Sequence, residues 1–128
     1  VNRKGLGDSV VFTGFITEGQ LRWMYENTAA YVFPSLSEGF GLPGLEAMAH
    51  GAPVVSSDAT CLPEIYGEAA HYFDPEDPQD MAVKIASVIN NLELRAKLIK
   101  NGQSQIKKYS WDKMAQETLE VYEKALHS

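Results

Sequence analysis

The sequence predicts an α/β protein with a mainly parallel sheet. Short apolar runs, each long enough for a strand, alternate along the chain with segments whose apolar residues recur at helical spacing. Glycine and proline residues separate the two kinds of segment. A helix between two strands allows the strands to pair in parallel. No repeat, low-complexity tract or linker divides the 128 residues, so we expect residues 1–128 to form a single domain.

Four apolar runs are predicted to be strands. Turn-forming residues close them, such as Gly14 after the first run and Pro34 after the second. A polar, glycine-containing loop over residues 1–9 precedes the first run. The predicted strands are residues 10–13, 29–33, 53–57 and 70–73.

Capping signals mark where several helices begin. Thr17 and Gln20 have the spacing of a capping box, and the helix that follows should end near Asn27. Asp77 precedes a proline at a helix start, and Ser110 is the expected N-cap of the last helix. Further helices are predicted from residue 43 or 44 to the stop at residue 51, over 62–65 and over 94–108.

Three of these helices carry apolar stripes that we expect to be buried in the core. A stripe at helical spacing is more often core than a partner site, and we interpret the last one in this way. The stripes are Leu21, Met24 and Tyr25; Met81, Ile85, Val88, Ile89 and Leu92; and Met114, Ala115, Thr118, Leu119, Tyr122 and Leu126.

Composition excludes several classes of protein. The net charge of −6 argues against a nucleic-acid binder, which needs a basic face. No apolar run approaches the roughly 20 residues that span a bilayer, and no signal peptide opens the chain. The single cysteine, Cys61, excludes an internal disulfide and fits a reducing compartment. These observations lead us to expect a cytoplasmic protein.

The stretch from Glu38 to Glu46, Glu-Gly-Phe-Gly-Leu-Pro-Gly-Leu-Glu, is the candidate site. It follows a predicted strand and leads into a helix, so its glycines allow backbone amides to approach a ligand at the positive end of the helix dipole. Amides attract an anion, and carboxylates accept hydrogen bonds from hydroxyls. A nucleotide sugar has both kinds of group. Alone, each glutamate could equally be a solvated surface acid.

The charge distribution around this stretch is one-sided. Between Thr28 and Val83 there are nine acidic residues and no Lys or Arg, whereas seven of the eleven basic residues lie from Arg95 onward. A phosphate bound by the glycine loop would therefore meet only amides and a helix dipole from this segment. Cations would have to come from elsewhere.

The double-Glu stretch resembles the signature of the retaining glycosyltransferases of family 4, the group 1 transferases. These enzymes have the GT-B architecture of two Rossmann-like domains that face a cleft. The resemblance covers nearly the whole chain and includes Glu38 to Ala49, then Gly51 with Pro53-Val54-Val55. Further motifs recur in the family's order, namely Val11-Phe12-Thr13-Gly14, Pro34-Ser35, Leu62-Pro63-Glu64-Ile65, Phe73-Asp74-Pro75 and Ser110-Trp111.

The resemblance implies that the chain is the donor-binding, C-terminal half of such an enzyme. Glu38 would then lie beside the donor sugar as nucleophile or stabiliser, although many accounts prefer a same-face reaction without a covalent intermediate. Glu46 would accept hydrogen bonds from the ribose hydroxyls. The segment Gly39, Phe40, Gly41 and Leu42 would approach the sugar and diphosphate, and the backbone of Phe15 and Ile16 would border the nucleobase.

The implied reaction moves a hexose, such as mannose or glucose, from a UDP-, GDP- or ADP-sugar to a saccharide or lipid-linked acceptor in polysaccharide, lipopolysaccharide or glycan synthesis. Amides can stabilise the departing diphosphate and Glu38 the oxocarbenium, so neither a metal nor a cofactor is expected. A lipid-linked acceptor would also allow peripheral contact with the inner face of the membrane.

The family also has features that this chain lacks. Its diphosphate-binding Arg and Lys come from strand–helix units that would precede Val1, as would the acceptor-binding N-terminal domain, and Cys61 stands where a small residue is common. We therefore expect a chain that binds the donor but is inactive alone. Without those units, the strand at 10–13 must pair differently, swap into a second copy, or leave an edge that pairs two copies.

Two other functions remain open from the sequence. One is a sugar-nucleotide epimerase of the GT-B type, which would need acid and base residues that we cannot place. The other is a non-catalytic nucleotide-binding or scaffolding domain. A dinucleotide-binding protein of the NAD type is disfavoured because no Gly-x-Gly-x-x-Gly follows a strand.

Overall fold

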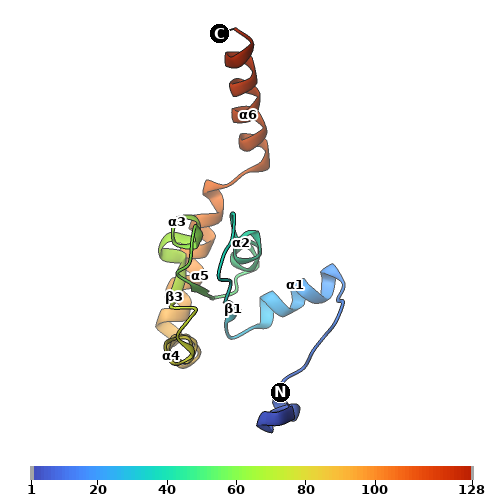
Figure 1. Cartoon of the computed structure of the whole chain (residues 1–128), viewed down its shortest axis with the longest axis vertical. Helices are drawn as coiled ribbons and strands as arrows, with labels where there is room; N and C mark the ends of the chain where they lie inside the picture. Colours follow the sequence, from blue (N-terminus) through green and yellow to red (C-terminus); the bar gives the residue numbers. More distant parts are fainter. Residues whose placement is uncertain (1, 128) are drawn as a thin grey trace.

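The structure is a computed structural model that describes residues 2–127. A parallel three-stranded sheet lies at its centre (Figure 1). Its strands are β1 (Tyr31–Phe33), β2 (Val54–Ser57) and β3 (Ala70–Phe73), in the order β1-β2-β3. Both pairs are parallel, because a helical connection joins each strand to the next. The predicted fold class is confirmed, and β3 has the bounds that the sequence predicted.

Helices cover both faces of the sheet. The α-helices of the described residues are α1 (Glu18–Asn27), α2 (Leu42–Ala49), α3 (Leu62–Tyr66), α4 (Pro78–Asn90), α5 (Leu92–Gln105) and α6 (Trp111–Leu126), of which α6 takes no part in this cover. Short 3-10 turns are η1 (Asn2–Lys4), η2 (Gly7–Ser9), η3 (Gly67–Ala69) and η4 (Ile106–Lys108). The first two occupy the region predicted as a loop.

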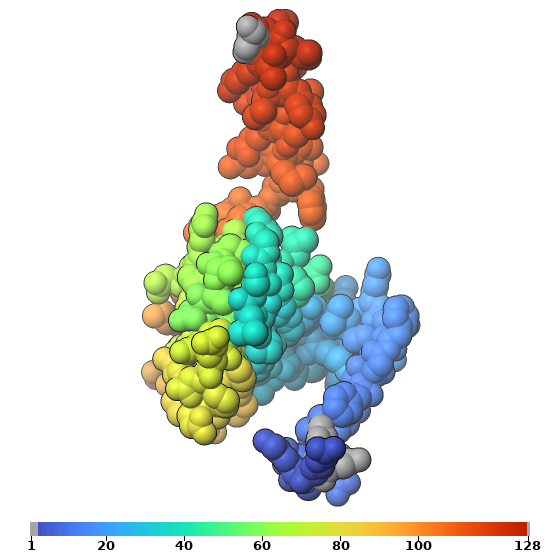
Figure 2. Space-filling view, in the orientation of Figure 1, coloured from blue at the N-terminus to red at the C-terminus, as the bar shows by residue number. Residues whose placement is uncertain are grey.

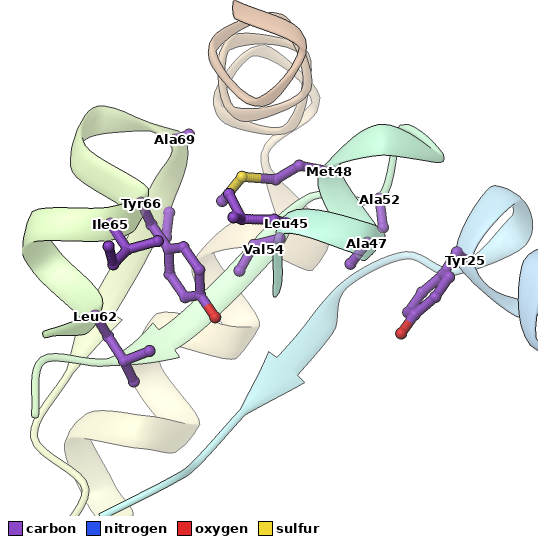
Figure 3. Packing of buried hydrophobic residues seen from close by; sticks show 11 residues of the cluster. Tyr25, Leu45, Ala47, Met48, Ala52, Val54, Leu62, Ile65, Tyr66 and Ala69 are labelled. Carbon is purple, nitrogen blue, oxygen red and sulfur yellow. The ribbon is translucent and has the colours of Figure 1, made fainter. Parts of the chain in front are cut away.

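Side chains that alternate along the strands pack into two separate hydrophobic cores. Val54 of β2 belongs to the cluster formed with α2, α3 and Tyr25 of α1, which Figure 3 shows from close by. The next residue, Val55, faces the opposite side and packs with Phe73, Val88 and Leu98. This alternation is the period of two expected of a strand. β2 is fully buried because helices pack on both faces of the sheet.

The capping predictions are confirmed. The Thr17 side chain accepts a hydrogen bond from the Gln20 amide, while the Gln20 side chain accepts one from the Thr17 amide. Asp77 caps α4 and Ser110 caps α6 in the same way, through their side-chain oxygens. Each cap satisfies amides that a helix leaves without an internal acceptor, typically worth about 1 kcal/mol.

The prediction of a strand at residues 10–13 is wrong. This segment has no strand pairing, and Val11 and Phe12 are 83% and 81% exposed. The reason is that a strand is stable only beside a neighbour, and within residues 2–127 the sheet contains only β1, β2 and β3. β1 pairs with β2 on one side, and no described segment pairs with its other edge.

The predicted burial of the last helix is also wrong. α6 projects away from the rest of the structure (Figure 1), and the space-filling view shows it standing clear of the sheet region (Figure 2). Every described side chain of α6 is exposed. Three residues of the other stripes, Met24, Ile89 and Leu92, are exposed as well. Helical periodicity identifies an apolar face but not whether another element covers it.

Candidate functional site

The candidate site lies where two parallel strands end. Residues 34–41 connect β1 to α2, and residues 58–61 connect β2 to α3. Because β1 and β2 are parallel neighbours, both connections leave the same edge of the sheet, the edge at which ligands bind in such folds. Hydrogen bonds between the two connections hold the site together, as the contacts of Glu38 show.

Glu38 is held by its backbone and by its carboxylate. Its amide donates to the Thr60 hydroxyl at 3.2 Å, and its carbonyl accepts from that hydroxyl at 3.3 Å and from the Cys61 thiol at 3.3 Å. The Ser35 hydroxyl donates to Glu38 Oε1 at 2.9 Å. This contact orients the carboxylate. Because Glu38 is only half-buried, the side chain remains accessible to a ligand.

The supports of Glu38 are themselves fixed. The buried Ser57, at the end of β2, donates a hydrogen bond from its hydroxyl to the Ser35 carbonyl. Thr60 has a φ of 51°, in the left-handed region that a β-branched residue rarely occupies. Such a conformation costs about 1–3 kcal/mol and persists only where the surroundings impose it.

Tyr66 fixes the far end of the glycine loop. Its hydroxyl donates to the Gly41 carbonyl at 2.5 Å, and a Cβ at either Gly41 or Gly44 would overlap its side chain. Gly41 also has a φ of 85°, which favours glycine. Burial raises the pKa of Tyr66, a backbone hydrogen bond with Gly44 opposes the shift, and the Glu38 carboxylate raises it further. Packing against Tyr66 therefore requires glycine at both positions, and backbone conformation requires it at Gly41 as well.

The loop ends at the N-terminus of α2, which begins one residue before the predicted position. Gly41 is the N-cap and makes no side-chain cap, Leu42 is the first helical residue, and Pro43 has no amide hydrogen. The Gly44 amide donates to the Gly41 carbonyl at 3.2 Å. The amide of Leu42 has no acceptor within the helix, so it is available to an anion at the positive end of the dipole.

Glu46 lies within α2, whereas Glu38 lies in the loop before the helix. Burial raises the pKa of Tyr25 and of Tyr31, and the Glu46 carboxylate adds to both shifts. His50 follows Glu46 by one helical turn, and its ring stacks on that of Tyr25 with 5.9 Å between the centroids, so Glu46 shares the face of α2 that meets α1. Burial also raises the pKa of Tyr66, where the Glu38 carboxylate adds to the shift instead, and in Figure 3 Leu45 and Met48 lie between Tyr66 and Tyr25. Glu38 lies three residues before the N-cap of α2 and Glu46 is the fifth residue of the helix, so the two glutamates flank its start along the chain.

The apolar residues of the loop are partly accessible. Phe40 is 39% exposed and its ring meets Tyr109 edge-on, with 5.4 Å between the centroids. Tyr109 is itself held by a 2.9 Å hydrogen bond to the Ile65 carbonyl. Leu42 is 43% exposed, and Gly39 has open space where a Cβ would be. A ligand could therefore approach the loop between Gly39 and Leu42.

The structure does not bring Phe15 and Ile16 to this loop. They line an open hollow of about 630 Å³ beside the start of α1, together with Trp23 and other residues between 13 and 24. No residue of 34–46 lines that hollow. Phe15 is 99% exposed. Their approach to the loop depended on a strand at 10–13, which is not formed, so the role of these two residues at a nucleobase stays a prediction.

Sequence reasoning missed Ser35, Thr60, Tyr66 and Tyr109 as parts of the site. Their contacts with the loop are mostly long-range: Thr60 is 22 residues from Glu38, and Tyr66 is 25 residues from Gly41. The polar residues Asp58 and Thr60, directly after the buried strand β2, were the signal available for Thr60. No comparable signal marks Tyr66, which looks like an ordinary core aromatic.

Residues 2–127 lack two features, a metal-binding cluster and a membrane-spanning helix. No group of three His, Cys, Asp or Glu side chains is placed to hold a metal ion there. In the same part of the chain, no helix has the length and apolar character needed to cross a membrane.

Comparison with known proteins places the chain in a family. Residues 1–105 match the sequence profile of the group 1 glycosyl transferases. The chain is 35% identical over 111 residues to the O-antigen chain mannosyltransferase B of Escherichia coli, an alignment that covers 87% of this chain and 29% of the relative.

Solved structures give the same result. A sucrose-phosphate synthase from Thermosynechococcus elongatus superposes with a TM-score of 0.87 at 29% identity, over 98% of this chain and 32% of that one. The C-terminal domain of a group 1 glycosyl transferase, LpcC from Francisella tularensis, superposes with a TM-score of 0.72 at 33% identity, over 84% of this chain and 56% of that one. This chain therefore belongs to the group 1 glycosyltransferase family and has the fold of the GT-B enzymes, of whose chains it spans only a part.

Proposed function

We propose that this chain binds the nucleotide-sugar donor of a retaining glycosyltransferase. The observation that carries the proposal is the glycine loop that leads into an amide-bearing helix start, with Glu38 before the helix, held by Ser35 and Thr60, and Glu46 within it. A diphosphate at the start of α2 would lie between a carboxylate for the sugar and another for the ribose. Glu38 would take the first role and Glu46 the second.

The proposed reaction breaks the bond between the anomeric carbon and the diphosphate oxygen. A bond to the acceptor hydroxyl oxygen forms on the same face of the sugar, and the hydroxyl proton passes to the departing diphosphate. Positive charge on the sugar is stabilised by Glu38, and negative charge on the diphosphate by the amides near Leu42. Neither a metal nor a cofactor is required in this scheme.

The relatives suggest which sugar is moved. A mannosyltransferase of O-antigen chains is among them, so we propose a hexose, with mannose first and glucose second, transferred to a saccharide or lipid-linked acceptor in cell-surface polysaccharide synthesis. A UDP- or ADP-sugar is the alternative to a GDP-sugar. With a lipid-linked acceptor, the enzyme would act in the cytoplasm at the membrane surface.

These 128 residues would provide only part of the active site. Residues 28–83, which contain the whole glycine loop, have no Lys or Arg to neutralise a diphosphate. We propose that the partner of this domain is a second domain that carries the acceptor site and contributes to the cleft. The chain alone would then bind the donor without turnover, since one missing charge-stabilising donor costs roughly 10²–10³ in rate.

A titration tests the proposal. The ¹⁵N-labelled chain is titrated with GDP-mannose, UDP-glucose and ADP-glucose, and amide shifts are followed by NMR. We expect one donor to shift the amide signals of Gly39 to Leu42. Glu46→Ala should lower the affinity for that donor roughly 10- to 100-fold, because a charged hydrogen-bond acceptor is lost. Glu64→Ala is the matched control, since Glu64 is an exposed acid in the first turn of α3. No shift with any donor, or an equal effect of both variants, would contradict the proposal.

A further inference from the structure

Thr60 has a backbone conformation that its side chain disfavours. It is the one non-glycine residue with positive φ among residues 2–127. A β-branched side chain is crowded in the left-handed region, where glycine or asparagine is usual. Thr60 is exposed, so packing in a core does not explain the conformation. Its polar contacts offer a reason.

Both backbone polar groups of Glu38 meet the hydroxyl of Thr60. The Glu38 amide donates to Thr60 Oγ1 at 3.2 Å, and Oγ1 donates to the Glu38 carbonyl at 3.3 Å. The hydroxyl can do both because it is donor and acceptor at once. The two contacts fix the peptide groups on either side of the Glu38 Cα, which sets the direction in which the side chain leaves the backbone.

The carboxylate of Glu38 has a separate support. Ser35 donates to its Oε1, and Ser35 is anchored in turn by Ser57. Ser35, supported by Ser57 of β2, thus orients the carboxylate, whereas Thr60 alone contacts both the amide and the carbonyl. Backbone strain that is held in place by such contacts is typical of functional sites.

We propose that Thr60 is a positioning residue that aims Glu38 at the donor sugar. The inference rests on the proposed function of Glu38 and adds a specificity: Thr60 affects recognition of the sugar but not of the nucleotide, because both hydrogen bonds of its hydroxyl go to Glu38. The hydroxyl, and not the size of the side chain, does this.

The test uses three variants and one control. Thr60→Val keeps the shape and removes the hydroxyl, Thr60→Gly relieves the backbone conformation and also removes it, and Thr60→Ser keeps it. Thr118→Val is the control, since the Thr118 hydroxyl only donates to the Met114 carbonyl within α6. For each protein we measure solvent exchange of the Glu38 amide by NMR, the thermal midpoint, and the Kd values of GDP-mannose and GDP.

We expect exchange of the Glu38 amide to accelerate about tenfold in Thr60→Val and Thr60→Gly and to stay near wild type in Thr60→Ser and in the control. GDP-mannose binding should weaken roughly 3- to 10-fold in the first two, the factor for one neutral hydrogen bond, while GDP binding is unchanged. Thr60→Gly should raise the thermal midpoint, so stability and sugar binding would move in opposite directions.

Two results would overturn the inference. One is an unchanged Glu38 amide in both Thr60→Val and Thr60→Gly; the other is an equal loss of GDP-mannose and GDP binding. If the wild-type chain binds neither ligand, the proposed function fails, and the exchange rates still decide whether Thr60 positions Glu38.

Discussion

The Tyr66 hydroxyl donates a hydrogen bond of 2.5 Å to the carbonyl of Gly41, the N-cap residue of α2. Both groups are buried, and the ring of Tyr66 occupies the space that side chains at Gly41 and Gly44 would need. One aromatic residue of α3 therefore sets the conformation in which the glycine loop enters the helix. The amides that would meet a diphosphate depend on this contact.

Removing this hydroxyl should affect both stability and binding. Tyr66→Phe leaves the buried Gly41 carbonyl with only the weaker Gly44 amide, and we expect the free energy of unfolding to fall by about 1–2 kcal/mol. Nucleotide binding should weaken as the loop loosens. Urea unfolding and a GDP titration measure the two effects.

Tyr72→Phe is the matched control for this prediction. Its hydroxyl donates to the Gly67 carbonyl at 2.7 Å, away from the loop. A similar loss of stability with unchanged GDP binding is expected there. Equal binding losses in the two variants would mean that Tyr66 has no special relation to the site.

The glycines of the loop should differ in their tolerance of a methyl group. A Cβ at Gly44 would overlap the Tyr66 hydroxyl and ring, so Gly44→Ala should lower the free energy of unfolding by about 1–3 kcal/mol or more. Gly39 has no heavy atom within 4 Å of an added Cβ, so Gly39→Ala should change stability little. Denaturant unfolding of both variants checks the contrast, and equal losses would contradict it.

Local signals made much of the fold predictable. Thr17, Asp77 and Ser110 cap helices through contacts within three residues, and such contacts are encoded in short stretches of sequence. The strand β3 and the start of α4 follow from patterns of the same range. Residues 10–13 failed because pairing needs a neighbour that local pattern cannot supply.

The candidate site was predictable to a similar degree. The loop from Glu38 to Glu46 was found, and in the structure it leads from β1 into α2. Thr60 and Tyr66 were not found, because they reach the loop from the next strand–helix connection, more than 20 residues away. Only the fold brings these segments together.

Stability should depend on pH through His71. Burial lowers the pKa of His71 below its usual 6.5, Lys84 lowers it further, and Asp80 partly opposes the shift. The unfolded chain therefore binds more protons than the folded one below about pH 6.5. The free energy of unfolding should be fully maintained above that pH and should fall as the pH drops through the lower, folded-state pKa.

Urea unfolding at pH 7.5 and 5.5 measures this dependence. His71→Gln should reduce the difference between the two conditions, whereas His127→Gln, at the exposed end of α6, should not. An unchanged pH dependence in His71→Gln would show that other groups account for it.

Two copies of the chain should associate at the unpaired edge of β1. β1 has one edge without a strand neighbour among residues 2–127, and the extended, exposed Val11 and Phe12 are suited to pair there in a second copy. We expect light scattering coupled to gel filtration to show a mass that rises with concentration. The double substitution Val11→Lys and Phe12→Lys should abolish the rise. Val83→Lys, an equally apolar exposed site on α4, is the control and should leave it unchanged.

Removal of α6 should cost little stability. All of its described side chains are exposed, so the helix contributes almost no apolar burial to the folded state, and its N-cap, Ser110, bonds only within the helix itself. A chain that ends at Ser110 keeps Tyr109, which contacts Phe40 and Ile65. We expect its free energy of unfolding to lie within about 1 kcal/mol of the full chain, as measured by urea denaturation followed by tyrosine and tryptophan fluorescence. A further truncation that removes Tyr109 should destabilise the fold and loosen Phe40. A large loss already on removal of α6 would mean that this helix packs on the domain in solution.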